Sequence, residues 1–214
     1  SGSDDKIFEP SLSNLNKYNL LPDKLGWNKN RINKEIDFVI IGMHAKKDNP
    51  ELIESLKQNI RIFSYPEFLY EFSKLKTRVV ISGSHGKTSI SSMILHVLKY
   101  NSINVDYMLG AQLEGFDTMV NLKEENEFIL IEGDEYLSSP LDLKSKFLWY
   151  KPNIALISGI SWDHINVFPT FHEYINQFRK FIDSIVPGGV LVYNESDKIL
   201  SKIVKESKNS IKKI

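Results

Sequence analysis

The sequence has no cysteine, no excess of charge of either sign and no long hydrophobic run. The lack of cysteine excludes a disulfide framework, thiolate metal ligands and a cysteine nucleophile. The 27 basic and 27 acidic residues give a formal net charge of zero, which argues against a non-specific nucleic-acid binder. No apolar segment approaches the roughly 20 residues of a membrane span, and residues 1–5 lack the features of a signal peptide. We therefore expect a cytoplasmic protein with no nucleic-acid or membrane partner.

The remaining composition is that of a folded protein, since 42% of the 214 residues are apolar. This length allows one large domain or two small ones. Hydrophobic patterns predict strands at 37–41, 60–63, 78–82, 103–108, 128–131, 154–157 and 190–193, and helices at 51–59, 66–74, 88–99, 170–185 and 198–208. Such alternation predicts an α/β fold with a mainly parallel sheet, whose ligand sites lie at the carboxyl ends of its strands. A charged joint at 74–77 divides the chain into domains expected at 1–76 and 77–214.

Four local patterns make more specific predictions. The apolar run at 37–41 is typical of a strand buried on both faces. Thr170 and Glu173 form a capping box, which predicts a helix start at this point. The lysine- and serine-rich tail from residue 202 is expected to be a solvated end. One helix is expected to pack on the sheet through a stripe at helical spacing, formed by Ile90, Met93, Ile94, Val97 and Leu98.

A glycine loop joins the predicted strand 78–82 to the predicted helix 88–99, and its residues are Gly83, Ser84, His85, Gly86, Lys87, Thr88 and Ser89. Glycines let backbone N–H groups turn toward an anion, and the start of the helix adds positive potential. Lys87 adds a cation, and the Thr88 hydroxyl can bind magnesium. Only two residues separate the glycines, whereas the common phosphate loop has four between them. The loop predicts a phosphate site, and a glycine turn without a ligand is the alternative.

An acidic run follows the predicted strand 128–131 and consists of Glu132, Gly133, Asp134 and Glu135. In a parallel sheet this position lies on the same edge as the glycine loop. A carboxylate there is a natural ligand for the magnesium ion that bridges nucleotide phosphates. A solvated turn is the alternative for this run.

Histidines near strand ends are the remaining candidates. His164 follows Asp163 after the strand 154–157, where it can ligate a metal, orient a carboxylate or contact a phosphate. The pair can equally form a local turn. His85 in the glycine loop and His44 after the strand 37–41 are both placed to touch a ligand.

The order and spacing of four segments, at 79–88, 132–135, 163–164 and 193–197, resemble the Mur ligase family. Members of this family are ATP-dependent amide-forming ligases of bacterial cell-wall synthesis, and their phosphate loop has the same two-residue spacing. The resemblance implies a partial Rossmann-like UDP-binding domain followed by a partial P-loop ATPase domain. Residues 132–136 and 144–152 look most like members that join UDP-N-acetylmuramate to the tripeptide L-alanyl-γ-D-glutamyl-meso-diaminopimelate in peptidoglycan recycling. Members that add L-alanine are the alternative.

The resemblance also implies roles for single residues. Lys87 would contact the β- and γ-phosphates of ATP, Thr88 and Glu132 would hold one Mg²⁺ ion, and His164 would help to hold a second. Lys87, Glu132 and His164 are thus the candidate catalytic residues. The nucleotide would be bound by the whole glycine loop, with Asn194 and Asp197 toward the adenosine. UDP-N-acetylmuramate would be bound by six residues: Gly2, Ser3, Asp4, Gly42, His44 and Asn49.

The implied reaction passes through an acyl phosphate, which the amine of the peptide or amino acid then attacks. By the same resemblance, the 214 residues lack an opening strand and a C-terminal domain that binds the amine, so this chain alone is expected to be inactive. A module that binds a nucleotide through the same loop without forming a bond is the alternative from another functional class.

Overall fold

The computed structural model describes residues 2–42, 45–139 and 141–214, which form two compact units. The first comprises Ser1–Tyr65 and Ser139–Leu141, and the second comprises Pro66–Ser138 and Asp142–Ile214. This division precedes the helix α3 (Tyr65–Ser73), whereas the sequence pattern placed the boundary after it, at residue 76. The helix goes with the second unit because Arg78 of that unit donates hydrogen bonds to the carbonyls at its end. Within the described ranges, no helix has the length and apolarity required to cross a bilayer.

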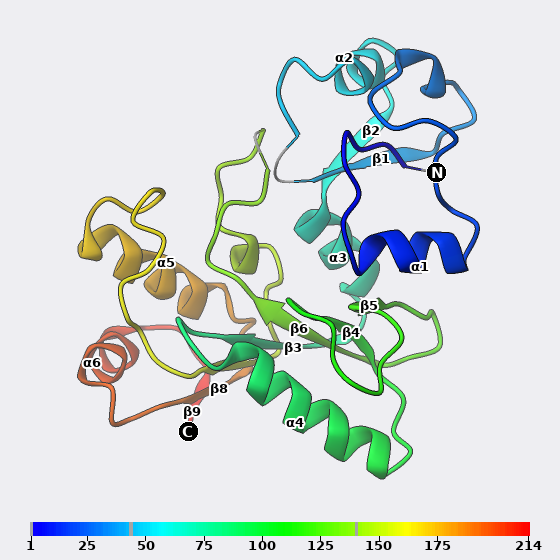
Figure 1. The fold of residues 1–214 in the computed structure, drawn as a ribbon. Coiled ribbons are helices and arrows are strands. Elements are labelled where there is room, and N and C mark those ends of the chain that lie inside the picture. Colours follow the sequence, from blue (N-terminus) through cyan, green and yellow to red (C-terminus); the bar gives the residue numbers. More distant parts are fainter. Residues whose placement is uncertain (1, 43–44, 140) are drawn as a thin grey trace. The chain divides into compact units, whose positions relative to one another are not determined.

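The first unit contains two parallel strands with helices around them (Figure 1). Its elements are α1 (Ser11–Lys17), the 3-10 helix η1 (Lys29–Arg31), β1 (Phe38–Ile41), α2 (Pro50–Lys57) and β2 (Arg61–Ser64). The expectation that the first strand is buried on both faces is wrong, because Phe38 is 40% exposed and Ile40 is 43% exposed. Successive side chains of a strand point to opposite faces, and only the face that carries Ile41 is covered.

The second unit is built on a seven-stranded sheet in the order β5-β4-β6-β3-β7-β8-β9. Every neighbouring pair is parallel except β4 and β5, which confirms the predicted α/β fold with a mainly parallel sheet. The strands are β3 (Thr77–Ser82), β4 (Asp106–Met108), β5 (Val120–Asn121), β6 (Phe128–Gly133), β7 (Ile154–Ile157), β8 (Val190–Tyr193) and β9 (Lys212–Lys213). Strand β3 lies between β6 and β7, so the loops that follow these three strands meet at one edge.

Three helices of this unit begin within one residue of their predicted starts: α4 (Lys87–Tyr100), α5 (Phe171–Ser184) and α6 (Lys198–Glu206). The sequence pattern did not predict the 3-10 helix η2 (Lys146–Leu148). The capping box of Thr170 and Glu173 is present at the start of α5. The expectation of a solvated tail is wrong, since Ile203 and Val204 are buried and β9 adds to the edge of the sheet beside β8.

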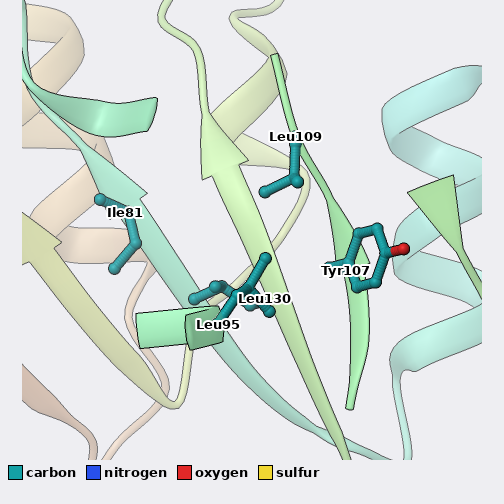
Figure 2. Packing of buried hydrophobic residues seen from close by; sticks show 5 residues of the cluster. All are labelled: Ile81, Leu95, Tyr107, Leu109 and Leu130. Atoms are coloured by element: carbon teal, nitrogen blue, oxygen red, sulfur yellow. The ribbon is translucent and has the colours of Figure 1, made fainter. Parts of the chain in front are cut away.

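Helix α4 packs on β3 and β6, but not through the whole predicted stripe. Met93 is 61% exposed and Val97 is 57% exposed, whereas Ser91 and Leu95 are buried. Ile90 and Ile94 of the predicted stripe do pack against the core, so the prediction is wrong for Met93 and Val97. Figure 2 shows Leu95 among buried side chains of the neighbouring strands, namely Ile81, Tyr107, Leu109 and Leu130. This core supports the strands whose carboxyl ends carry the candidate site.

Candidate functional site

The glycine loop connects β3 to α4, as the sequence predicts. Gly83 has a φ of +122°, and a Cβ atom there would lie 2.2 Å from the Oγ atom of Ser158. Gly86 precedes the helix with a φ of +81°, a value that side chains rarely adopt. The Nζ atom of Lys87 donates a hydrogen bond of 2.7 Å to the carbonyl of Gly83. Both glycines are thus required by the loop, which folds back over the lysine ammonium group.

The loop after β7 holds the glycine loop from the side. The backbone N–H of Ser84 donates to the carbonyl of Gly159 over 3.0 Å, and that of Ser158 donates to the carbonyl of Ser82 over 3.0 Å. The hydroxyl of Ser158 donates to the carbonyl of His85. The side chains of His85 and Ser89 are exposed at this edge. Hydrogen bonds with the loop after β7 therefore hold the glycine loop at Ser84 and His85.

Glu132 lies at the end of β6, beside the start of α4. The hydroxyl of Thr88 donates to Oε2 of Glu132 over 3.1 Å, and the glutamate is 5% exposed. A Cβ atom on Gly110 would lie 2.9 Å from the same oxygen, so a side chain there would displace the carboxylate. Burial raises the pKa of the Glu132 carboxyl, although Thr88, Gly110 and Lys87 act in the opposite direction.

The other oxygen of Glu132 provides a test of the predicted magnesium site. Oε1 is buried and has no hydrogen-bond partner among the residues that the structure describes. An unpaired buried carboxylate oxygen is costly unless a donor or a cation meets it. Magnesium prefers carboxylate and hydroxyl oxygens, so Thr88 and Glu132 fit the predicted ion.

A second carboxylate, Glu135, is fully buried next to Lys87. Its Oε1 atom accepts a hydrogen bond of 2.6 Å from the Tyr174 hydroxyl and lies 3.6 Å from Nε2 of His164. Its Oε2 atom lies 3.5 Å from Nζ of Lys87. The oxygens of Tyr174 and Ser84 are 2.8 Å apart. Burial and the adjacent Glu135 charge raise the pKa of the Tyr174 hydroxyl, which keeps it protonated.

Asp134 and His164 complete this side of the site. Nζ of Lys146 donates to Asp134 over 2.6 Å; burial alone would raise the pKa of Asp134, but Lys146 lowers it below the usual value. One ligand atom from each of Asp134, Glu135 and His164 lies within 4.8 Å of the other two, so this group can hold a metal ion. The three predicted metal ligands thus fall into two groups, with Thr88 beside Glu132 and His164 beside Glu135.

Asn194 and Asp197 follow β8, at the same edge of the sheet. Oδ2 of Asp197 accepts from the backbone N–H of Ile160 over 2.7 Å, and its Oδ1 atom caps α6. The backbone N–H of Asn194 donates to the carbonyl of Ile157 over 3.2 Å. Asp197 therefore contacts the loop after β7, and Asn194 contacts the last residue of β7; their role toward adenosine stays a prediction.

Three of the predicted substrate residues, Gly2, Ser3 and Asp4, line a cavity of about 510 Å³ in the first unit. The Ser3 hydroxyl donates to Glu51 over 2.8 Å and accepts from Arg31 over 2.7 Å. Of the other three predicted residues, Asn49 caps α2 with its side chain and Gly42 is exposed after β1, whereas His44 lies outside the described residues.

Four residues of the site had no role in the sequence prediction: Gly110, Glu135, Ser158 and Tyr174. Glu135 belongs to the acidic run, so its position was recognisable but its partner was not. Tyr174 reads as one of the apolar positions of α5. A buried tyrosine needs a partner for its hydroxyl, and this is the signal that could have identified it. Gly110 and Ser158 belong to no recognisable pattern.

The profile of the Mur ligase middle domain matches residues 81–214, which include the glycine loop, Glu132 and His164. A UDP-N-acetylmuramate–L-alanine ligase of Clostridium botulinum is 33% identical over 86% of this chain, which spans 38% of that relative. A UDP-N-acetylmuramate–L-alanyl-γ-D-glutamyl-meso-2,6-diaminoheptandioate ligase of Haemophilus influenzae is 29% identical over 92% of this chain and 44% of its own. The chain therefore spans less than half of the length of the curated relatives that it matches.

The fold is also found in solved structures. The crystal structure of a UDP-N-acetylmuramate:L-alanyl-γ-D-glutamyl-meso-diaminopimelate ligase from Neisseria meningitides superposes with a TM-score of 0.86 at 24% identity. The match covers 99% of this chain and 68% of that one. With the middle-domain profile matched over more than half of its residues, this chain belongs to the Mur ligase family.

Proposed function

We propose that this chain supplies the nucleotide site of an ATP-dependent ligase that acts on UDP-N-acetylmuramate. The amine substrate is the tripeptide L-alanyl-γ-D-glutamyl-meso-diaminopimelate, and the setting is peptidoglycan recycling. The observation that carries the proposal is the meeting of Lys87, Thr88 and Glu132 at the carboxyl ends of β3 and β6, with the Thr88–Glu132 hydrogen bond of 3.1 Å. Membership of a family of ATP-dependent ligases supports it.

The proposed chemistry follows from charge. A carboxylate is a poor acyl donor because oxide would be its leaving group, so transfer of the γ-phosphoryl group of ATP must first make an acyl phosphate. Attack of the amine on that carbonyl then forms the amide and releases phosphate. An ammonium has three donors. Lys87 directs one to the Gly83 carbonyl over 2.7 Å and one to Glu135 over 3.5 Å, which leaves a third for phosphate oxygens.

Thr88 and Glu132 would hold a magnesium ion, and the Asp134–Glu135–His164 group fits a second one. When bound, magnesium neutralises charge on the phosphate oxygens during phosphoryl transfer. The chain's own contribution is positioning: hydrogen bonds tie the segment after β3 to Glu132 of β6 and to the loop after β7.

The first unit is the proposed site for UDP-N-acetylmuramate. Its cavity of about 510 Å³ lies in the range of ligand sites and is lined by the predicted residues Gly2, Ser3 and Asp4. The domain roles predicted from the sequence, UDP-sugar first and ATP second, are part of this proposal.

L-Alanine is the second candidate for the amine. The relative that is 33% identical is named for L-alanine, whereas the structure with a TM-score of 0.86 is named for the tripeptide. The two substrates share an L-alanyl amine, so the activated carboxylate and the nucleotide site serve both in the same way. The choice between them rests on the substrate assay.

The assay uses the complete gene product with ATP, Mg²⁺, UDP-N-acetylmuramate and either tripeptide or L-alanine. Phosphate release and mass spectrometry of the UDP-linked product report the reaction. We expect product with the tripeptide and none with L-alanine, and the reverse result assigns the second candidate. ADP binding without product from either amine would overturn the ligase proposal in favour of a nucleotide-binding module.

A further inference from the structure

A chain of hydrogen bonds connects the glycine loop to three other segments: the loop after β7, helix α5 and the acidic run after β6. The backbone N–H of Ser161 donates to the Ser84 hydroxyl over 2.8 Å, Ser84 and Tyr174 are 2.8 Å apart, and Tyr174 reaches Glu135 over 2.6 Å. Glu135 and Tyr174 are fully buried, and Ser84 is 8% exposed. Helix α5 thus reaches the phosphate loop and the acidic run through one hydroxyl.

The direction of this chain follows from the number of protons. A tyrosine hydroxyl has one proton, and an ionised carboxylate can only accept. Tyr174 therefore donates to Glu135, so Ser84 must donate to Tyr174 and accept from the backbone of Ser161. The Ser84 and Tyr174 hydroxyls each accept one hydrogen bond and donate one. Rotation of the Tyr174 hydroxyl proton would remove the short hydrogen bond to the buried Glu135 carboxylate, which is costly.

The two contacts of Glu135 differ in strength. An O–H donor to a carboxylate is short at about 2.5–2.7 Å, and a lysine–carboxylate hydrogen bond is about 2.7–2.9 Å. The Tyr174 bond of 2.6 Å lies in the first range, whereas the Lys87 ammonium is 3.5 Å from the carboxylate, beyond the second. Glu135 is therefore anchored to Tyr174 by a short hydrogen bond, and its hydrogen bond from Lys87 is a long one of 3.5 Å.

The distance between Glu135 and Lys87 matters because the carboxylate and a nucleotide phosphate would compete for the same ammonium group. An unanchored carboxylate in a buried site pairs with the nearest cation, since an unpaired buried charge is costly. Four groups face Glu135: Lys87 on α4, Asp134 after β6, His164 after β7 and Tyr174 on α5. Of these, Lys87 is the lysine, and its ammonium group is the one that would also meet phosphate.

We propose that Tyr174 is a positioning residue whose hydroxyl restrains Glu135 and so keeps Lys87 available for nucleotide phosphates. The inference rests on the proposed nucleotide site. Without the hydroxyl, Glu135 moves onto Lys87 and competes with phosphate for it. The effect of Tyr174 then depends on the negative charge of Glu135, which a role in packing alone would not.

The test measures ADP binding to the 214-residue chain by calorimetry, with Mg²⁺ and again with a chelator. Tyr174→Phe keeps the ring and removes the hydroxyl, and we expect ADP affinity to fall about tenfold or more, as for loss of a hydrogen bond to a charged group. The loss appears with and without Mg²⁺, because it acts through Lys87. Tyr107→Phe is the matched control, since it removes a tyrosine hydroxyl elsewhere in the same unit, and it leaves ADP affinity within about twofold.

Glu135→Gln supplies the decisive comparison. The amide can still accept from Tyr174 but carries no charge to compete for Lys87. In the chelator, where metal binding by Asp134, Glu135 and His164 plays no part, this variant binds ADP at least as tightly as the unsubstituted chain. In that background and in the chelator, adding Tyr174→Phe changes affinity by less than about twofold. If Tyr174→Phe does not fold, Glu135→Gln alone remains a test, and weaker ADP binding by it in the chelator overturns the proposal.

Four further outcomes are decisive. An equal loss from Tyr174→Phe in both backgrounds, or a loss seen only with Mg²⁺, overturns the role through Lys87. Unchanged binding by Tyr174→Phe overturns the inference while the proposed nucleotide site stands. No ADP binding by the unsubstituted chain overturns the proposed nucleotide site itself, and the inference with it.

Discussion

The hydroxyl of Thr88 and Oε2 of Glu132 lie 3.1 Å apart although 44 positions separate them in the sequence. They meet because β3 and β6 are parallel neighbours in register, with Ile81 opposite Glu132. The end of β6 and the first turn of α4, the helix that follows β3, therefore lie at the same edge of the sheet. The Glu132 carboxylate and the Thr88 hydroxyl are held together there, and none of the described residues donates a hydrogen bond to Oε1 of Glu132.

Glu132→Gln should stabilise the ligand-free chain at neutral and basic pH. Burial raises the pKa of Glu132, so its ionisation opposes folding. For a raised pKa this cost is absent below the unfolded value, about 4.3, and grows as the pH rises through the folded value. Thermal unfolding without Mg²⁺ should show a higher Tm for the variant at pH about 8 and no difference near pH 4.

The exposed Glu125→Gln is the control, and its Tm should follow the unsubstituted chain at both pH values. Equal Tm values for Glu132→Gln and the unsubstituted chain at the higher pH would contradict the burial cost. Glu132→Gln should also weaken Mg²⁺-dependent nucleotide binding, since a neutral amide is a poorer ligand for a hard cation than a carboxylate.

Lys87→Ala should abolish turnover of the complete gene product and weaken ADP binding at least tenfold, about 1.4 kcal/mol. The reason is that the ammonium of Lys87 sits over the glycine loop, 2.7 Å from the Gly83 carbonyl, where phosphate charge must be offset. Lys99→Ala is the matched control, because Lys99 lies in the last turn of the same helix. Its exposed ammonium donates to the Gly115 carbonyl and lies over the Phe116 ring. Near-normal turnover by Lys87→Ala would remove the phosphate-loop assignment.

Arg78→Lys should destabilise the second unit by about 2–4 kcal/mol. The buried guanidinium donates to five backbone carbonyls, those of Ser73, Lys74, Lys76, Tyr150 and Lys151. A lysine ammonium cannot span this set, so several carbonyls lose their partner. Urea unfolding measures the change, and Arg179→Lys at a partly exposed ion pair should cost less than about 1 kcal/mol. Similar costs for the two variants would show that the Arg78 contacts contribute little.

Asp106→Ala should cost about 3–5 kcal/mol, the usual penalty for breaking a buried ion pair. Asp106 is fully buried and lies 2.7 Å from Nζ of Lys76, and it also accepts from the backbone of Lys123 and the amide of Asn126. Lys202→Ala, at an exposed pair 3.9 Å from Glu206, should change unfolding by less than about 0.5 kcal/mol. Equal midpoints in urea for the two variants would argue against the buried pair.

Much of the fold was predictable because its signals are local. The Thr170–Glu173 capping box marks the start of α5, and the glycine loop between β3 and α4 is where the spacing places it. Short elements without periodicity, such as α1 and β9, left no such signal. The exposed Met93 shows the limit for α4, because helical spacing identifies a stripe but several arcs of one helix can be apolar.

The candidate site divides in the same way. The sequence by itself determined which groups are available, since Lys87, Thr88, Glu132 and His164 all follow strands in recognisable motifs. The tertiary structure decided the partners: Thr88 meets Glu132, His164 meets Glu135, and Tyr174 crosses from α5 to the same carboxylate. A motif is set by neighbours along the chain, whereas a partner 39 or 44 positions away depends on the order and register of the strands between them.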